Sequence, residues 1–503
     1  MTNSSETKPS ALDNRQGNTT EQVLTLDDAS LRYRAIADWQ TLYDQEKAIA
    51  ELFYIAYLAE EVEPGQRPLT FVFNGGPGAA SVYLHLGALG PKRVGFDAEG
   101  GMPRPPVRLL DNPQSWLRFS DLVFVDPIGT GFSRTWPQDR DNHKTNNGEK
   151  PTPESQESPE ENRFWEMEQD LNSLGEFMQR FLSRYQRWLS PIFIAGESYG
   201  GFRVAKMTRK LQETFGIGLS GAILISPALE FSLLEGSDYN LSYWATLIPS
   251  YAAAAIYHNR VQPPADLAAH LQRAEQFAQE TLIPFLALGD RVSPSQSQAV
   301  YATLAELIGL PVALIEQHGG RVDREIFARE LLREEGKVLG LYDGAVTAID
   351  PFPDRLVFAG NDPTLDGVQR IFTGAINHHL RQTLKVETEL SYHLLNLDVF
   401  KSWKYVFKRE VKQGYMGAMD DLRAGMALNP YMQVFITHGI YDLVTTYFCS
   451  AHLAALMKLA PELRPNLTLK NYSGGHMFYT WEASRQQWFA DMQGFYAQAV
   501  SAD

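Results

Sequence analysis

Short, continuous runs of apolar residues recur along the chain, and longer amphipathic stretches separate them. Runs without a polar residue at every second position are typical of strands buried on both faces of a parallel sheet. The clearest amphipathic stretch, from Phe164 to Leu182, repeats its apolar residues mostly at helical spacing. This alternation of strands and helices predicts a doubly wound α/β sheet. The expected strands are Leu69–Phe73, Leu122–Val125, Ile192–Ala195, Ala222–Ser226, Gln433–Thr437 and Leu467–Tyr472.

The N-terminal part of the chain has a different pattern. Residues 1–22 are polar, and we expect them to form a disordered tail. From Leu31 to Leu58 aromatic and aliphatic residues predominate, with a polar break at residues 44–46. This pattern predicts antiparallel strands that lead into the fold.

Two stretches interrupt the rhythm of strands and helices. Residues 137–163 contain no large apolar residue, so they cannot contribute to a core, and we expect a mobile polar insertion. Residues 229–425 contain mostly helical segments, such as residues 266–288, and we expect them to form an inserted, largely helical cap. Residues 23–228 and 426–503 would then form the α/β core.

Composition narrows the classes of function. Hydrophobic residues make up 44% of the 503 residues, which is enough for a large core and excludes a globally disordered chain. The 45 basic and 60 acidic residues give a net charge of −15, so a nucleic acid is not an expected partner. Cys449 is the single cysteine, which excludes an intrachain disulfide and a cysteine-rich metal site.

No segment of the sequence has the pattern of a membrane span. No apolar run reaches the roughly 18 residues that a spanning helix needs. The first residues lack the basic and apolar regions of a secretory signal. We therefore expect a cytoplasmic protein without a membrane partner, and a periplasmic location is less favoured. The oligomeric state stays open.

Two local patterns resemble cofactor or metal motifs. Gly216, Gly218 and Gly221 match G-x-G-x-x-G, but they follow a helical pattern and precede a strand. A dinucleotide site needs the order strand, glycines, helix, so we interpret these glycines as a turn. His378 and His379 are adjacent in sequence and poorly placed to bind one metal ion, so we expect surface or packing roles. The sequence thus predicts no cofactor and no metal site.

The segment from Ile192 to Phe215 has the pattern of a nucleophile elbow. An apolar strand leads directly into the residues GESYG at Gly196–Gly200, and a helical pattern follows at once. In a G-x-S-x-G turn the glycines leave room for a sharp bend, and the bend raises the serine hydroxyl above the strand ends. Ser198 is therefore the candidate nucleophile.

A serine nucleophile needs a histidine base and a carboxylate that orients the base. On this type of fold they follow in the order serine, acid, histidine. Asp442 lies just after the strand Gln433–Thr437, and His476 lies just after the strand Leu467–Tyr472. Because α/β sheets assemble their sites at the carboxyl ends of strands, Asp442 and His476 are the candidate acid and base.

The third requirement is an oxyanion hole. On this type of fold it uses the backbone N–H after the nucleophile and a second N–H from an earlier loop that follows a strand. Tyr199 supplies the first. The glycine-rich turn Asn74–Gly78, directly after the strand Leu69–Phe73, is the candidate for the second because missing side chains let backbone amides approach a ligand.

These motifs and several further blocks resemble the serine carboxypeptidases. The resemblance implies an α/β-hydrolase core with an inserted cap, Ser198 as nucleophile, His476 as base and Asp442 as orienting acid. Family members from secretory compartments have NGGPGCSS and several disulfides, whereas this chain has residues Ala79–Ser81 there and one cysteine, in the style of bacterial relatives. The matching blocks are FNGGPG at Phe73–Gly78, LGP at Leu89–Pro91, NPQSW at Asn112–Trp116, VDPIGTGFS at Val125–Ser133, GESYGG at Gly196–Gly201, HGIYD at His438–Asp442 and GGHM at Gly474–Met477.

The same resemblance implies roles around the nucleophile. The amides of Gly76 and Tyr199 would be the oxyanion donors, and Asn74 and Glu197 would hold the C-terminal carboxylate of a peptide substrate. Many family members also carry an acid shortly before the Gly-Pro pair, where this chain has Ala88. The pair of acids expected at the carboxylate site is therefore incomplete.

The favoured hypothesis is an exopeptidase that removes C-terminal residues from peptides through an acyl-enzyme. A prolyl aminopeptidase also uses a GGPG loop on this fold but typically has a tryptophan after the serine, where this chain has Tyr199. An esterase or acyltransferase needs the same triad and stays open. A non-enzymatic binding protein is disfavoured because every catalytic position is filled. We expect the cap to set the preference for the C-terminal residue and the sheet to supply the chemistry.

Overall fold

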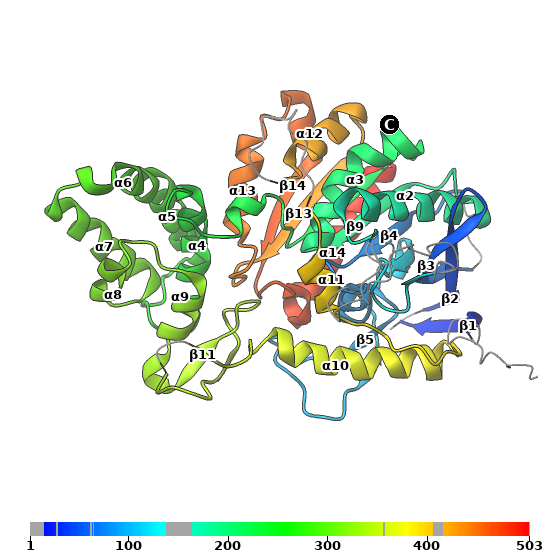
Figure 1. Ribbon diagram of the computed structural model, residues 1–503, viewed down its shortest axis with the longest axis horizontal. Helices are drawn as coiled ribbons and strands as arrows, with labels where there is room; N and C mark the ends of the chain where they lie inside the picture. Colours follow the sequence, from blue (N-terminus) through cyan, green and yellow to red (C-terminus); the bar gives the residue numbers. More distant parts are fainter. Residues whose placement is uncertain are drawn as a thin grey trace, which may run out of the picture.

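A mostly parallel β-sheet forms the centre of the protein (Figure 1). The computed structural model describes residues 15–26, 29–60, 63, 65–136, 163–355, 358–405 and 416–501. The strands of the central sheet are β1 (Asn18–Thr25), β2 (Ser30–Asp44), β3 (Lys47–Ala59), β4 (Leu69–Phe73), β7 (Asp121–Val125), β8 (Arg134–Thr135), β9 (Ile192–Glu197), β10 (Gly221–Ile225), β13 (Gln433–Gly439) and β14 (Leu467–Tyr472). Two separate pairs are β5 (Lys92–Val94) with β6 (Leu109–Asp111) and β11 (Lys337–Leu339) with β12 (Thr347–Ile349).

The strand order of the sheet is β1-β2-β3-β7-β4-β9-β10-β13-β14, with β8 beside β3. Strands β7, β4, β9, β10, β13 and β14 run parallel to one another, and β1, β2 and β3 are antiparallel. Phe73 is in register with Gly196, and Ile225 is in register with Glu197, so the carboxyl ends of β4, β9 and β10 meet at one edge. The predicted α/β-hydrolase architecture is confirmed.

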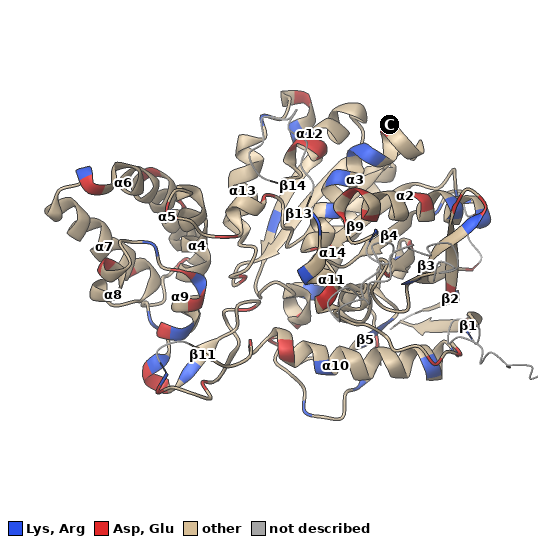
Figure 2. Ribbon diagram, in the orientation of Figure 1, with Lys and Arg blue, Asp and Glu red and all other residues tan. Residues whose placement is uncertain are grey.

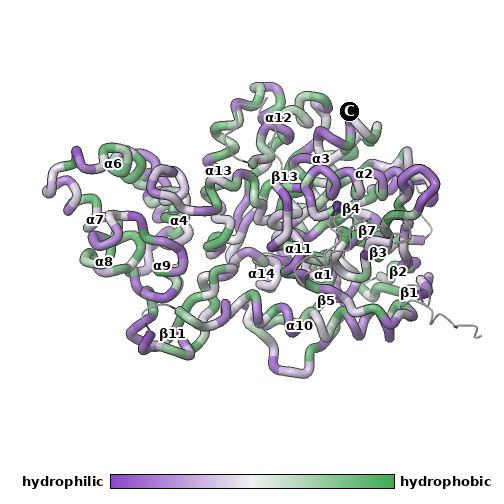
Figure 3. The backbone as a smooth tube through the Cα atoms, in the orientation of Figure 1, coloured by the Kyte–Doolittle hydropathy of each residue, from purple (hydrophilic) through white to green (hydrophobic). Residues whose placement is uncertain are grey.

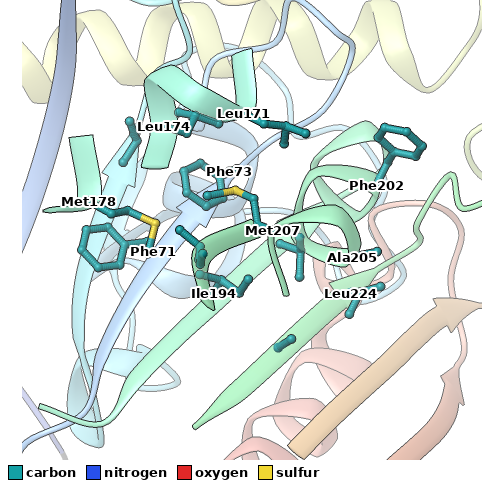
Figure 4. Close-up of a cluster of buried hydrophobic side chains, with 14 of the residues drawn as sticks. Phe71, Phe73, Leu171, Leu174, Met178, Ile194, Phe202, Ala205, Met207 and Leu224 are labelled. Carbon is teal, nitrogen blue, oxygen red and sulfur yellow. The ribbon is translucent and has the colours of Figure 1, made fainter. Parts of the chain in front are cut away.

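Helices cover both faces of the sheet, and alternate residues of each strand point into the two layers. On one face Phe71, Phe73 and Ile194 pack with side chains of α2 (Met167–Arg184) and α3 (Tyr199–Phe215), as Figure 4 shows. This alternation explains why the strands read as continuous apolar runs. In Figure 3 the hydrophobic colour gathers along these central strands.

The opposite face is covered by helices from distant parts of the chain. Val72, Phe193 and Ile223 share a hydrophobic cluster with side chains of α14 (Glu482–Val500) and α10 (Leu365–His378). Shorter elements complete the layers of the core. They are α1 (Val82–Leu84), η1 (His85–Leu89), η2 (Trp116–Arg118), α13 (Tyr447–Leu456), η10 (Pro461–Asn466) and η11 (Phe478–Thr480).

Between β10 and β13 the chain first forms a group of helices with its own hydrophobic core, on one side of the sheet (Figure 1). This core also includes Tyr441, Leu443 and Trp481, which follow β13 and β14, so the helix group packs on the loops after the last two strands. The helices are α4 (Leu241–Tyr257), α5 (Leu267–Gln276), η6 (Phe277–Leu282), α6 (Ile283–Leu288), α7 (Pro294–Ile308), α8 (Val312–Gln317) and α9 (Arg324–Glu330), with the short turns η5 (Phe231–Leu233), η7 (Gly289–Arg291) and η8 (Arg333–Glu335).

The predicted cap of residues 229–425 is too wide. Helix α10 packs on a face of the sheet layer, where its Phe372 ring lies 5.3 Å from the ring of Tyr83. Helix α12 (Met419–Leu428) packs on α3, and its Leu422 shares a cluster with Phe202. The amphipathic pattern predicts that these segments are helical. It does not predict whether their apolar faces pack on the cap or on the sheet. The remaining elements there are η9 (His379–Thr383) and α11 (Leu397–Ser402).

The prediction of a disordered tail over residues 1–22 is wrong at its end. Asn18 begins β1, which pairs with β2 from Asn18 opposite Ala37 to Thr25 opposite Ser30. Most of β1 is partly or fully exposed at the edge of the sheet, so it needs few apolar residues and resembles a tail in composition. Residues 1–14 lie outside the described residues, as do residues 137–162 of the predicted polar insertion.

The two cofactor-like patterns have structural roles. Gly216 ends α3 in the left-handed conformation with a φ of 63°, and Gly221 begins β10, so the glycines form a turn as predicted. His379 is buried, and its Nε2 lies 2.8 Å from the hydroxyl of Tyr57, which fits a packing role.

Charged residues of both signs are mixed along the outer helices and loops, as Figure 2 shows. Within the described residues, no helix is long and apolar enough to cross a membrane. Over the same residues, no group of three or more His, Cys, Asp or Glu side chains is arranged to hold a metal ion.

Candidate active site

A cavity of about 70 Å³ lies at the carboxyl ends of β4 and β9. Five predicted site residues line it, from the loop after β4, the turn after β9 and the loop after β14. These are Asn74, Gly76, Glu197, Ser198 and His476. The other lining residues are Gly75, Ala79, Tyr83, Tyr342, Leu365, Leu395 and Met477.

Ser198 occupies the sharp turn between β9 and α3, with a φ of 59° and a ψ of −123°. A positive φ is uncommon for a residue other than glycine, and here it lifts the side chain away from the strand. A Cβ on Gly196 would lie 2.1 Å from the carbonyl oxygen of Gly200, and a Cβ on Gly200 would lie 2.4 Å from that of Phe73. Both glycines of the elbow are therefore required by close backbone packing.

Asp442 and His476 meet at the ends of β13 and β14. Oδ2 of Asp442 lies 2.7 Å from Nδ1 of His476. Oδ1 of Asp442 accepts the backbone N–H groups of Val444 and Thr445 at 2.8 and 3.0 Å, which fixes the orientation of the carboxylate. The Thr445 hydroxyl lies 2.7 Å from the same Oδ2 and 3.0 Å from the imidazole. With Nδ1 held by Asp442, Nε2 of His476 is left to take a proton.

The surroundings of His476 favour its protonated form. Burial alone would lower the pKa of His476, because a buried imidazolium loses hydration. The Asp442 carboxylate and its hydrogen bond, helped by Glu197, outweigh burial and raise the pKa of His476 above its ordinary value. Asp442 thus stabilises the protonated form of His476.

The turn Asn74–Gly78 lies directly against the elbow. A Cβ on Gly75 would lie 2.6 Å from the backbone nitrogen of Tyr199 and 2.9 Å from the Cβ of Ser198. Gly76 has a φ of 98°, a conformation that favours glycine. Gly75 thus lies against the backbone nitrogen of Tyr199 and the Cβ of Ser198, so the turn that carries the predicted oxyanion donor Gly76 borders the elbow.

Buried Arg203 fixes this turn to the elbow. Its Nη1 donates to the carbonyl oxygen of Asn74 at 2.7 Å, and its Nε donates to Asp170 at 2.7 Å. Its guanidinium lies over the ring of Tyr199, whose hydroxyl accepts a hydrogen bond from Trp403 at 3.0 Å. The backbone nitrogen of Tyr199 thus lies beside the turn Asn74–Gly78, while its side chain packs outside the cavity lining.

Asn74 and Glu197 meet inside the cavity. Oδ1 of Asn74 accepts the N–H of Leu84 at 3.0 Å, so the amide nitrogen faces Glu197 and donates to its Oε2. The hydroxyl of Tyr479 donates to Oε1 of the same carboxyl group at 2.7 Å. Burial is the largest influence on Glu197 and raises its pKa to about 7, although His476, Tyr479 and Asn74 oppose the shift.

The ring of Tyr479 packs against Gly87, the neighbour of Ala88, where a second acid was expected. A Cβ on Gly87, the neighbour of Ala88, would lie 2.7 Å from the Tyr479 ring. Unlike an acid, a tyrosine hydroxyl adds no negative charge beside Glu197 at neutral pH. The partner of Glu197 is therefore a phenol in this chain, which the sequence motifs do not reveal.

The structure adds further residues that sequence reasoning missed. Thr445 contacts both Asp442 and His476, and Tyr479 holds Glu197. Tyr83 and Tyr342 line the cavity, and the buried hydroxyl of Tyr83 has no hydrogen-bond partner among the described residues. Thr445 follows Asp442 by three positions and Tyr479 follows His476 by three, but this spacing gives no sequence signal for their contacts.

A model of the serine carboxypeptidase family matches residues 38–248. Serine carboxypeptidase-like 5 of Arabidopsis thaliana is 29% identical over 204 residues, which cover 39% of this chain and 40% of that protein. The pheromone-processing carboxypeptidase KEX1 of Yarrowia lipolytica is 31% identical over 162 residues, 32% of this chain and 21% of that protein. The chain thus matches less than half the length of these curated relatives.

Solved structures with α/β-hydrolase folds are also similar. Proline iminopeptidase of Mycobacterium smegmatis is 13% identical, with a TM-score of 0.33 and coverage of 96% of this chain and 99% of that chain. Monoglyceride lipase of Saccharomyces cerevisiae is 12% identical, with a TM-score of 0.36 and coverage of 92% and 96%. Over residues 38–248, which include the elbow, the chain is similar to the serine carboxypeptidases.

Proposed function

We propose that this protein is a serine-type carboxypeptidase that removes C-terminal residues from peptides through an acyl-enzyme. The observation that carries the proposal is the carboxyl group of Glu197, bonded to Asn74, in the same small cavity as Ser198. A protonated carboxyl group and an amide N–H are donors that suit a carboxylate. The expected substrate is therefore a peptide with a free C-terminal carboxylate. A cytoplasmic location stays a prediction from the sequence.

The triad geometry supports acyl transfer to Ser198. His476 takes the hydroxyl proton as the Ser198 oxygen bonds to the scissile carbonyl carbon, and Asp442 stabilises the imidazolium. The N–H groups of Gly76 and Tyr199 stabilise the negative oxygen of the tetrahedral intermediate. His476 then gives its proton to the leaving amine, the C–N bond breaks, and a water activated by the same histidine hydrolyses the acyl-enzyme.

The cavity supports cleavage at the end of a chain. Glu197 and Asn74, which suit a terminal carboxylate, line the same cavity as Ser198. Binding energy from a carboxylate bound there positions the last peptide bond over Ser198. The unpartnered hydroxyl of Tyr83 offers a further hydrogen bond to the residue that leaves.

Glu197 predicts a pH dependence of KM. Below its pKa of about 7 Glu197 is protonated and donates to the substrate carboxylate, whereas above that pH it is ionised and repels it. KM for a peptide acid should therefore rise as pH increases through about 7, and KM for the matching peptide amide should not. The measurement is KM against pH for both substrates.

Two variants control this experiment. Glu197→Gln should flatten the profile of the peptide acid, because an amide donates without titrating. Glu51→Gln is a matched control, since Glu51 is another buried glutamate whose pKa is raised by burial but which lies on β3. Parallel profiles for acid and amide in the wild type would show that another group holds the carboxylate.

Tyr479→Phe should move the same profile. The Tyr479 hydroxyl stabilises ionised Glu197, so its removal raises the pKa of Glu197 and shifts the increase in KM to higher pH. Tyr472→Phe is the matched control, because Tyr472 donates to the carboxylate of Asp491 at 2.6 Å outside the cavity lining. An unchanged or downward shift in Tyr479→Phe would contradict the role of this hydroxyl.

A further inference from the structure

A loop of the inserted region contacts the loop that carries the triad acid. This loop, Leu341–Ala345, joins β11 and β12, and we call it the clamp loop. The carbonyl oxygen of Leu341 accepts the N–H of Leu443 at 3.0 Å, and the N–H of Gly344 donates to the carbonyl oxygen of Tyr441 at 2.8 Å. The two bonds bracket Asp442 on both sides.

The clamp loop also contacts the loop that carries the histidine. The carbonyl oxygen of Tyr342 accepts the backbone N–H of His476, and the Tyr342 ring stands edge-on to the imidazole with 5.1 Å between centroids. Oδ2 of Asp343 accepts the N–H of Gly475 at 2.9 Å and the indole N–H of Trp481 at 2.9 Å. The loops that carry Asp442 and His476 are thus both hydrogen-bonded to the clamp loop.

The packing at this contact is close enough to restrict the sequence. A Cβ on Gly475 would lie 2.1 Å from the carbonyl oxygen of Tyr342 and 2.4 Å from the Cα of Asp343. The Asp343 side chain is buried, and its Oδ1 accepts a third N–H, that of Ala345, at 3.0 Å. The second glycine of the GGHM motif is therefore explained by the clamp loop that lies on it.

We propose that Asp343 is a positioning residue, which holds the His476 loop in register with Asp442 and Ser198. The inserted region then contributes to the chemical step, in addition to the substrate preference expected from the sequence. The inference rests on the proposed roles of Ser198, Asp442 and His476, but not on the nature of the acyl group that Ser198 accepts.

Asp343→Ala should slow acylation with little effect on binding. The substitution leaves the N–H groups of Gly475 and Trp481 without their acceptor, so the histidine loop gains freedom. Because a small displacement of a reacting group strongly lowers the rate of the chemical step, we expect a fall in kcat of about tenfold or more. KM for a peptide acid should change less than about twofold, since Glu197 and Asn74 do not bond to Asp343.

A pH profile separates positioning from general stability. The titratable groups near the His476 imidazole include Asp442, Glu197, Tyr342 and His438, and the bond to Asp442 raises the pKa of His476. When the loop loosens, this bond weakens, and the acid limb of kcat/KM should shift to lower pH. A residue that only stabilises the fold would leave the limb in place.

The experiment compares full-length variants well below their melting temperatures. The rate of labelling of Ser198 by a fluorophosphonate, kcat, KM and the acid limb are measured for wild type, Asp343→Ala and Asp343→Asn. Asp343→Asn keeps the shape but offers one oxygen to three N–H donors, so a several-fold loss of labelling rate is expected. Asp350→Asn is the matched control, because Asp350 is a buried carboxylate of the same region that bonds to Arg329 and the N–H of Phe352.

The proposal predicts slower labelling and a shifted acid limb in both Asp343 variants, with Asp350→Asn at the wild-type rate. Wild-type labelling and an unshifted limb in a folded Asp343 variant would overturn it, and if the alanine variant does not fold, Asp343→Asn decides. Absence of labelling in the wild type would instead refute the proposed role of Ser198, so the two failures are distinguishable.

Discussion

Replacing Ser198 by alanine should reduce peptide hydrolysis by about 10⁶-fold, because triad residues act as one unit and the loss of the nucleophile disables them together. Ser198 is the serine held at the strained turn between β9 and α3, in the cavity that His476 also lines. A fluorophosphonate should label the wild type at this residue and leave Ser198→Ala unlabelled. Mass spectrometry of the labelled peptide locates the modified residue.

Ser250→Ala is the matched control for this prediction. Ser250 is a buried serine of α4 whose hydroxyl has no hydrogen-bond partner among the described residues, so its removal should leave turnover and labelling unchanged. Labelling of a different residue, or normal turnover of Ser198→Ala, would refute the assignment of the nucleophile.

Asp442→Asn should lower kcat by about 10³–10⁴-fold, because it changes the tautomer of the histidine. The N–H groups of Val444 and Thr445 point at Oδ1 of Asp442, so an asparagine places its oxygen there and its NH₂ group toward His476. The NH₂ group donates to Nδ1 of His476, which moves the remaining proton to Nε2. Such an imidazole cannot accept the proton of Ser198.

The measurement is steady-state kcat at a pH where wild-type turnover is maximal. Asp421→Asn is a suitable control, since Asp421 pairs with Lys206 between α12 and α3, outside the cavity. A loss of less than about tenfold in Asp442→Asn would show that Asp442 does not set the tautomer.

Much of the core could be predicted because its signals are local. Each parallel strand is a short segment buried on both faces, so Leu69–Phe73 and Leu467–Tyr472 have the bounds expected from their residues. The elbow is also local, since Gly196 and Gly200 are needed within one turn of the backbone. Asp442 and His476 follow the last two strands, and the parallel topology alone brings them together.

The residues that were missed depend on contacts between distant segments. Tyr479 and Glu197 are 282 positions apart, and Asp343 reaches Gly475 over 132 positions. The residues next to such a tyrosine or aspartate in the sequence contain no pattern that predicts its distant partner. β1 was missed for a related reason, because an edge strand is stabilised by its pairing with β2 and its own residues remain polar.

Glu197 has a phenol as partner in place of the expected second acid. Burial raises the pKa of Glu197 to about 7 against the opposing effects of His476, Tyr479 and Asn74, and the Tyr479 hydroxyl is a neutral partner of this carboxyl group. The pair of acids expected from the resemblance would hold a proton between two carboxyl groups. This chain instead combines one buried acid with a phenol, so we expect its KM profile to follow a single titration.

The proposed removal of residues from free C-termini can be tested by timed mass spectrometry of N-acetylated peptides. We predict that acetylated peptides with a free carboxylate lose one C-terminal residue at a time, and that Ser198→Ala leaves them intact. Acetylated peptides that stay intact while peptides with a free N-terminus are shortened from that end would contradict the claim, as would cleavage within the chain.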